Sequence, residues 1–184
     1  MQEQKHKKIL KFEKQNKIKF NVNCLFELSY KQLKAIYNYF ELKNHHYKEY
    51  NEIEDLIRIN WLTLNKTQKE KELPTWIMNI KNIYELINKN FFFKPKFTFY
   101  FEYILPSTKR IDILVKNKNK ELIIECSHNY TDELLNQKEN QAKIYQEEYQ
   151  QLTNLKINKV VYINDNIKEN ETIKNTIKAL KELN

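Results

Sequence analysis

Apolar and polar positions alternate with a period of two over three successive runs of the chain. This is the period of a β-strand, in which neighbouring side chains face opposite sides of a sheet. The three predicted strands are residues 97–105, 109–115 and 121–127. Because only short turns separate them, we expect these strands to pair as antiparallel neighbours.

The pattern then changes to that of a helix. Thr131 or Asp132 is placed to cap a helix that we expect to run to about Thr153. An apolar strand at 159–164 and a final helix at 168–183 follow. A strand, a helix and a strand in succession form a crossover unit, so the last strand should lie parallel to the third.

Helical spacing of apolar residues also precedes the first strand. The predicted helices are residues 4–19, 29–42, 52–64 and 74–90. Residues 21–28 are predicted to form a short strand or an extended lead-in, and 65–72 a charged loop. Pro74 suits the first turn of its helix, where a missing N–H costs nothing.

These elements predict an α/β (α+β) fold with a mixed sheet flanked by helices. From Pro74 onwards the order is α-β-β-β-α-β-α. We expect a core of residues 74–184, with residues 1–73 forming a basic helical extension packed on it. Single-domain size agrees with this, since 41% of the 184 residues are hydrophobic.

Composition excludes several classes of protein. The chain contains no glycine, which excludes the glycine-rich phosphate and dinucleotide loops. With two cysteines, neither a disulfide framework nor a cysteine zinc site is expected. No apolar run reaches the length of a membrane helix, and no secretory signal is recognisable. We expect a cytoplasmic protein, or one of an organelle matrix if the AT-rich coding bias reflects an organellar genome.

The net charge of +8 favours an anionic partner, with nucleic acid first and DNA favoured over RNA. The first 20 residues carry seven lysines and two glutamates. The alternative for this segment is an ordinary solvated helix. A homodimer or a larger nucleoprotein assembly is the candidate form of the complex.

Acidic residues interrupt the predicted strands where apolar ones are easier to bury. Asp112 lies among isoleucine, leucine and valine, and Glu125 follows Leu122, Ile123 and Ile124. A carboxylate in a central strand needs a cation, a metal or a hydrogen-bond donor. Carboxylates on adjacent strands can face the same side, and such oxygen ligands suit Mg²⁺ or Mn²⁺. That ion orients water and stabilises the charge of a phosphodiester in its transition state.

Over residues 74–164 the chain resembles the PD-(D/E)xK nuclease superfamily. The resemblance rests on the element order, on Arg110-Ile111-Asp112 in the second strand and on Glu125-Cys126-Ser127 in the third. It implies that Asp112 and Glu125 hold the divalent metal, and that Glu102, or else Glu85, supplies a third acid.

The same resemblance extends to the helix that follows. Many relatives carry a glutamine and a tyrosine four residues apart there, and Gln141 and Tyr145 match that spacing on one helix face. Together with Arg110 and Ser127, they are the residues expected to contact nucleic acid.

The chain departs from the family at the lysine two residues after Glu125, where it has Ser127. The family lysine positions or activates the attacking water. Lys138, one turn before Gln141 on the same face, is the expected substitute, and Lys109 is a weaker one.

The predicted function is that of a metal-dependent nuclease, a DNA endonuclease with Glu102, Asp112, Glu125 and Lys138 as catalytic residues. One alternative is an inactive nuclease-like fold that serves as a basic subunit of a nucleoprotein assembly, for example an organellar one. Another is an interaction module with structural acids. In that reading Asp112 pairs with Arg110, Glu125 balances a lysine of the helix above it, and Tyr145 belongs to the core.

Overall fold

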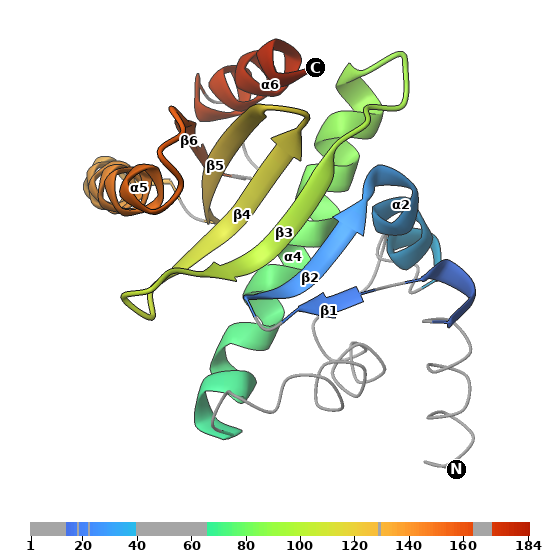
Figure 1. Cartoon of the computed structure of the whole chain (residues 1–184), viewed down its shortest axis with the longest axis horizontal. Helices are drawn as coiled ribbons and strands as arrows, with labels where there is room; N and C mark the ends of the chain where they lie inside the picture. Colours follow the sequence, from blue (N-terminus) through green and yellow to red (C-terminus); the bar gives the residue numbers. More distant parts are fainter. Residues whose placement is uncertain (1–13, 18, 22, 40–65, 129, 164–170) are drawn as a thin grey trace.

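The computed structural model describes residues 14–17, 19–21, 23–39, 66–128, 130–163 and 171–184. The elements are β1 (Lys19–Asn21), β2 (Cys24–Ser29), α2 (Tyr30–Tyr39), α4 (Lys66–Asn90), β3 (Thr98–Ile104), β4 (Arg110–Asn117), β5 (Lys120–Ser127), α5 (Asp132–Thr153), β6 (Asn158–Ile163) and α6 (Glu171–Leu183). Figure 1 shows them as one sheet with helices around it.

The strands lie side by side in sequence order, from β1 to β6. Neighbours are antiparallel except for β5 and β6, which are parallel. The five strands β2 to β6 form the body of this mixed sheet, and β1 is a three-residue strand at its edge. The predicted α/β fold and the order α-β-β-β-α-β-α are therefore confirmed, including the parallel crossover through α5.

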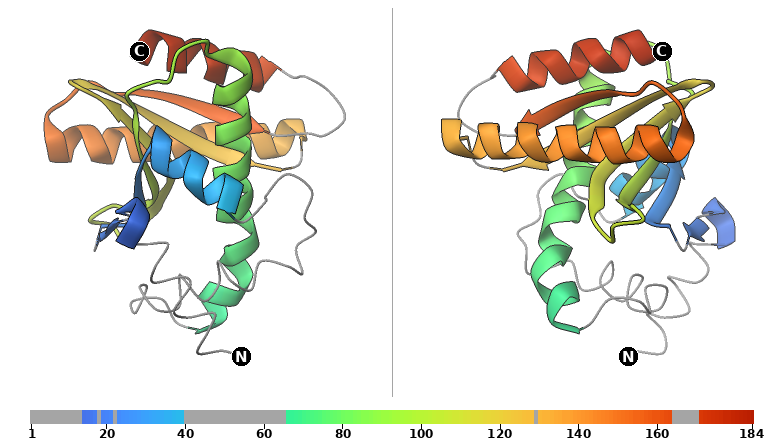
Figure 2. Two further views of the ribbon diagram at one scale, coloured as in Figure 1. Left: turned by 90° about the vertical axis from the view of Figure 1, so that its right-hand side faces the viewer. Right: turned by 60° about the vertical axis from the view of Figure 1, so that its left-hand side comes forward.

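Helices cover both faces of the sheet. On one face α2, α4 and α6 pack against phenylalanines and isoleucines such as Phe99, Ile113 and Ile124. On the other face α5 packs through Tyr145 and Tyr149. Figure 2 shows α4 and α5 on opposite sides of the strands. None of the helices in the described part of the chain combines the length and apolar composition that a membrane span requires.

The N-terminal segment joins the sheet through β2, which pairs with β3 in the register Leu28↔Phe99. A capping box starts α2, as Ser29 N–H donates to Gln32 Oε1 and Gln32 N–H donates to Ser29 Oγ. Residues 14–16 are helical and Lys19 opens β1, so the predicted end of the first helix is wrong. Its first ten residues and the predicted helix at 52–64 lie outside the described residues.

The predicted charged loop at 65–72 is also wrong, because α4 begins at Lys66. The residues before Pro74 are mostly lysine, glutamate, glutamine and leucine, which favour a helix. Pro74 then lies inside α4, where its missing N–H removes one backbone hydrogen bond without ending the helix. The expected division at residue 73 accordingly falls within α4.

The two cysteines provide a test of this core. Cys24 is 1% and Cys126 is 3% exposed. Burial, followed by the nearby charge of Glu27, raises the pKa of Cys24 to about 12. We expect neither thiol to react with a disulfide reagent at pH 8 in the native protein, and both to react in guanidinium chloride. Rapid labelling of the native protein would contradict the described packing.

Candidate active site

The site lies where β4 and β5 stop pairing. Their ladder runs from Asn117↔Lys120 to Ile113↔Ile124. Beyond it, side chains take the backbone's place: Asp112 N–H donates to Glu125 Oε1 at 3.2 Å, and Cys126 N–H donates to Asp112 Oδ2 at 2.7 Å. The two acids thus occupy the gap between the strands, and the backbone of each strand orients the carboxylate of the other.

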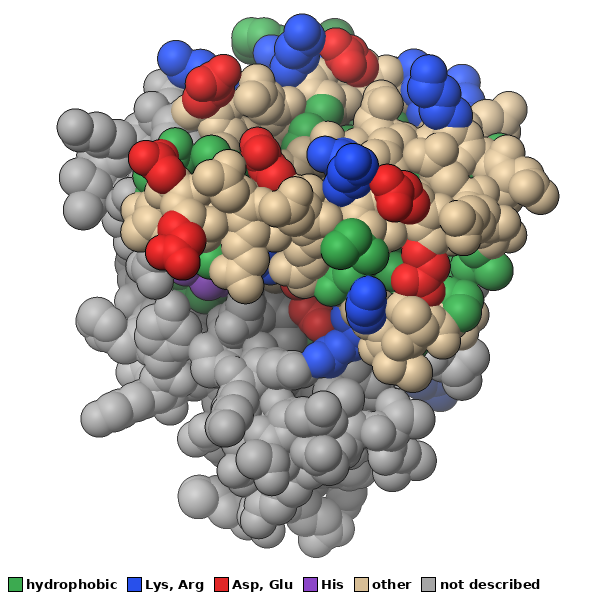
Figure 3. All heavy atoms as spheres, turned by 90° about the vertical axis from the view of Figure 1, so that its left-hand side faces the viewer, with side chains coloured by type: hydrophobic (Ala, Val, Ile, Leu, Met, Phe, Trp, Pro, Cys, Tyr) green, Lys and Arg blue, Asp and Glu red, His purple; other side chains and the backbone are tan. Residues whose placement is uncertain are grey.

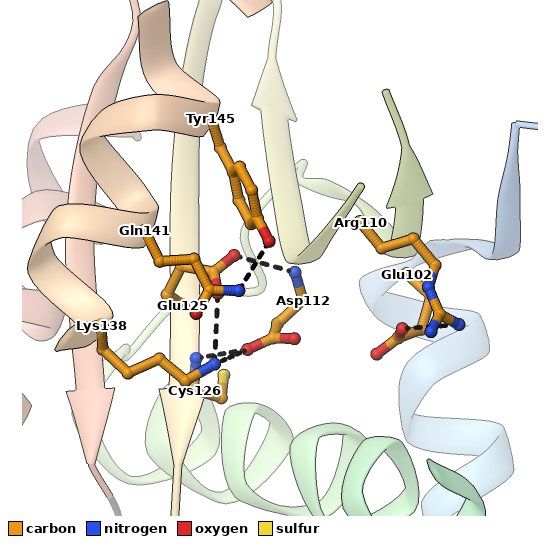
Figure 4. Close-up of polar contacts among 8 residues, drawn as sticks. All are labelled: Glu102, Arg110, Asp112, Glu125, Cys126, Lys138, Gln141 and Tyr145. Carbon is orange, nitrogen blue, oxygen red and sulfur yellow. Dashed lines mark hydrogen bonds and ion pairs between the residues drawn. The ribbon is translucent and has the colours of Figure 1, made fainter. Parts of the chain in front are cut away.

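Lys138 of α5 contacts both acids. Its Nζ lies 3.1 Å from Asp112 Oδ2 and 3.3 Å from Glu125 Oε2 (Figure 4). The Glu125 side chain is 0% exposed, and those of Asp112 and Lys138 are 16% and 18% exposed. The two acids therefore lie on one face of the sheet and converge on a single cation in a nearly dry pocket.

The electrostatics of the three groups are linked. Burial raises the pKa of Glu125 well above its usual value, and the charge of Asp112 adds to this, while Lys138 opposes it. Burial alone would lower the pKa of Lys138, but the charges of Asp112 and Glu125 outweigh it, so that pKa is raised. Lys138 consequently stays protonated at neutral pH and can act as a cation and hydrogen-bond donor, not as a base.

Gln141 and Tyr145 lie on the same side of α5 as Lys138 (Figure 4). Gln141 Nε2 donates to the Tyr145 hydroxyl at 2.6 Å. Tyr145 is buried in the cluster between α5 and the sheet, and burial raises its pKa. The structure thus brings Gln141 to the edge of the pocket. Tyr145 belongs to the core and is also the hydrogen-bond partner of Gln141.

Glu102 and Arg110 form a separate pair beside this cluster (Figure 4). Arg110 Nη1 lies 3.5 Å from Glu102 Oε2. Glu102 has φ 53°, an uncommon left-handed conformation for a residue within a strand. Arg110 is therefore the ion-pair partner of Glu102, whereas the ammonium group that contacts Asp112 belongs to Lys138.

Three further candidates are Ser127, Lys109 and Glu85. Ser127 ends β5, half buried and in register with Ile163 of β6. Lys109 is exposed in the turn between β3 and β4. Glu85 accepts a hydrogen bond from the Tyr37 hydroxyl at 2.7 Å, and it belongs to α4 on the opposite face of the sheet.

One support of the site is missing from the sequence interpretation. Both the N–H and the hydroxyl of Ser107, in the turn before β4, donate to the carboxylate of Glu148 on α5, at 2.8 and 2.7 Å. This contact ties the β3–β4 turn to the helix that carries Lys138. Its only signal in the sequence is that Glu148 follows Tyr145 by three residues, on a neighbouring face of the helix.

The donor set fits a hard divalent cation in part. In the described part of the chain, no group of three or more His, Cys, Asp or Glu side chains is placed to hold a metal. Two carboxylates with water and substrate oxygens are nevertheless an ordinary ligand set for Mg²⁺. In the structure the two acids converge on one positive charge, the Lys138 ammonium.

Comparisons with models of protein families, with curated proteins and with solved structures found no match for this chain.

Proposed function

We propose that the protein is a metal-dependent nuclease that hydrolyses phosphodiester bonds, with DNA as its preferred substrate. The observation that carries the proposal is the convergence of Asp112 and Glu125, from neighbouring strands, on the Lys138 ammonium. Two acids and a lysine are the groups that the PD-(D/E)xK resemblance requires. In this proposal the lysine comes from α5 and not from the position of Ser127.

Asp112 and Glu125 are the proposed ligands of Mg²⁺ or Mn²⁺. Bound there, the ion would lower the pKa of a water molecule and stabilise the charge that develops on the phosphate. The hydrogen bonds between each carboxylate and the other strand hold the acids in position before any ligand binds.

Lys138 is the proposed stand-in for the family lysine. An ammonium group has three N–H donors, and two acceptors are the carboxylates of Asp112 and Glu125. One donor is left for the attacking water or for a phosphate oxygen. Because its pKa is raised, Lys138 orients and neutralises charge, and another group must accept the proton of the water.

Arg110 and Gln141 flank the pocket and are the proposed contacts to the substrate. A guanidinium group binds a phosphate through two parallel hydrogen bonds, which suits Arg110 at the start of β4. Glu102 would have to leave Arg110 to reach a metal, so its role as a third acid stays a prediction. Ser127 and Tyr145 also keep their assignment to nucleic-acid contact as a prediction.

A second function is favoured by one observation. Lys138 forms ion pairs with both acids within the folded chain, as a structural lysine does, and the family lysine is absent after Glu125. This arrangement suits a nuclease-like protein that binds nucleic acid without cutting it, as a subunit of a nucleoprotein assembly.

Cutting of supercoiled plasmid separates the two. We expect nicking that requires Mg²⁺ or Mn²⁺ and stops with EDTA. Asp112→Asn should lower the rate about 100-fold or more, since it removes a charged ligand of the reacting site. Asp132→Asn, an equal change of charge at the exposed start of α5, should leave the rate unchanged. Binding of plasmid without cutting in all three proteins would reject the nuclease and support the subunit.

A further inference from the structure

The loop between α4 and β3, residues 91–97, carries two phenylalanines on the outside of the molecule. Phe92 is 102% exposed and Phe93 is 86% exposed, more than any other large apolar side chain in the described part of the chain. Buried aromatic rings are among the largest sources of hydrophobic stabilisation, and these two contribute none. Two adjacent exposed rings are a candidate contact surface for a partner outside the chain.

This exposure is built into the fold. Phe91 and Phe97 contact each other edge to face at 6.1 Å, and Phe97 is 1% exposed. Pro95, which lies between these two residues in the sequence, is buried as well. The Phe91 N–H donates to Ile87 O at the end of α4. The loop is thus anchored on both sides of the two exposed rings, so they are held outwards before a partner arrives.

Exposed lysines lie in the same loop as the two rings, at Lys94 and Lys96, and elsewhere at this end of the sheet. Thr98, directly after the loop, pairs with Lys116 of β4, so the turn between β4 and β5 lies at the same end of the sheet. The C-terminal end of α6 joins it there, because Lys120 Nζ donates to Glu182 O at 2.7 Å. The exposed lysines of this end are Lys89, Lys94, Lys96, Lys118, Lys120 and, in the last turn of α6, Lys181.

Two acidic side chains lie at this end, Glu121, which is paired with Lys116 at 2.8 Å, and the exposed Glu182 of α6. The loop 91–97 itself carries two lysines and no acid, so its lysines are the ones offered to an external anion. The face that α5 presents differs, since acidic and basic side chains are interspersed over it (Figure 3). Charge complementarity with phosphate is therefore a property of the end that carries Phe92 and Phe93.

We propose that this end of the sheet binds single-stranded nucleic acid. Phe92 and Phe93 stack on unpaired bases, and lysines of the same end, above all Lys94 and Lys96, contact the phosphates, which is the combination that single-strand binding uses. The site lies at the opposite end of the sheet from the start of β4 and the end of β5, which carry Asp112 and Glu125 (Figure 1). It needs no metal and holds whether or not the protein cuts.

Fluorescence anisotropy of a labelled oligothymidylate in EDTA tests the stacking. We expect the double variant Phe92→Ser/Phe93→Ser to bind about tenfold more weakly than the unaltered protein, or weaker still. Leu152→Ser/Leu155→Ser makes the same kind of change at side chains that are 52% and 45% exposed, and should bind as the unaltered protein does. A blunt duplex should not distinguish the variants, because its bases are already stacked.

The lysine contacts have a separate readout. Replacing Lys94 and Lys96 with glutamine should reduce the slope of log affinity against log salt by about 0.7 for each lysine. Oligothymidylate binding by the phenylalanine variant equal to that of the unaltered protein would overturn the proposal. The proposal would also be overturned if the phenylalanine variant lost binding to phosphatidylserine vesicles but not to oligothymidylate, because the loop would then be a membrane contact. The phenylalanine variant should still nick plasmid, so failure here is distinct from failure of the proposed nuclease.

Discussion

Replacing Lys138 with methionine is expected to abolish phosphodiester cutting and to lower the free energy of unfolding by about 3 kcal/mol at pH 8. The stem of the side chain is kept, while the cation shared by Asp112 and Glu125 is lost. One of the carboxylates left behind is fully buried, and an unpaired buried charge is among the most costly groups in a folded protein.

The loss of stability should depend on pH. Burial raises the pKa of Glu125, and Lys138 is the group that opposes this, so the variant raises that pKa further. A raised pKa favours the protonated acid in the folded state. The loss of folding free energy therefore grows as pH rises above about 4.3, the pKa of glutamate in the unfolded chain. Urea unfolding should therefore show a small loss at pH 5 and a large one at pH 8.

Lys143→Met is the matched control, since it removes an exposed lysine of the same helix. It should change the free energy of unfolding by no more than about 0.5 kcal/mol and leave cutting intact. Equal losses for Lys138→Met at both pH values would mean that Glu125 is not the group left unpaired.

Glu125→Gln is expected to act in the opposite direction on stability while also abolishing cutting. Glutamine keeps an oxygen to accept the Asp112 N–H, and Lys138 keeps Asp112 as its partner while losing the hydrogen bond to Glu125 Oε2. The change removes a buried charge whose pKa is raised mainly by desolvation. We expect a gain of about 1–2 kcal/mol at pH 8, and little or no gain near pH 4.5, where the folded wild type holds the proton.

Thermal or urea unfolding at the two pH values measures this, with Glu139→Gln on the exposed side of α5 as the control. A more stable and inactive variant is the signature of a residue kept for function at the expense of stability. If Glu125→Gln instead lowered the free energy of unfolding, and did so more at pH 8 than at pH 4.5, the ionised carboxylate would be shown to stabilise the fold.

The arrangement of the sheet follows largely from local patterns. The period of two, the short turns and the amphipathic helix place β3, β4, β5, α5 and β6 correctly, because neighbouring residues decide these elements. The pairing of β2 with β3 is different, since Leu28 and Phe99 are distant in sequence. No local pattern indicates that contact, so the sequence predicts a short strand or an extended lead-in at residues 21–28 without identifying its partner in the sheet.

The candidate site divides in the same way. Strand alternation and a short hairpin bring Asp112 and Glu125 to one face, and helical spacing brings Lys138 over them. The position of Glu102 depends instead on one left-handed backbone angle and on its ion pair with Arg110. The alternation of apolar and polar residues carries no information on the backbone angle or on the ion pair. The sequence therefore favours Glu102 as a metal ligand, while in the structure Glu102 is paired with Arg110.

Binding of Mn²⁺ followed by electron paramagnetic resonance is the most direct test of the cation pocket. We expect one bound ion for each chain, and binding that is lost in both Asp112→Asn and Glu125→Gln but kept in Asp132→Asn. Lys138→Met should bind Mn²⁺ at least as tightly as the wild type, because it removes the cation that competes for the two carboxylates. Mn²⁺ binding that is absent from the wild type, or unchanged when Asp112 and Glu125 are replaced, would contradict the proposed metal site.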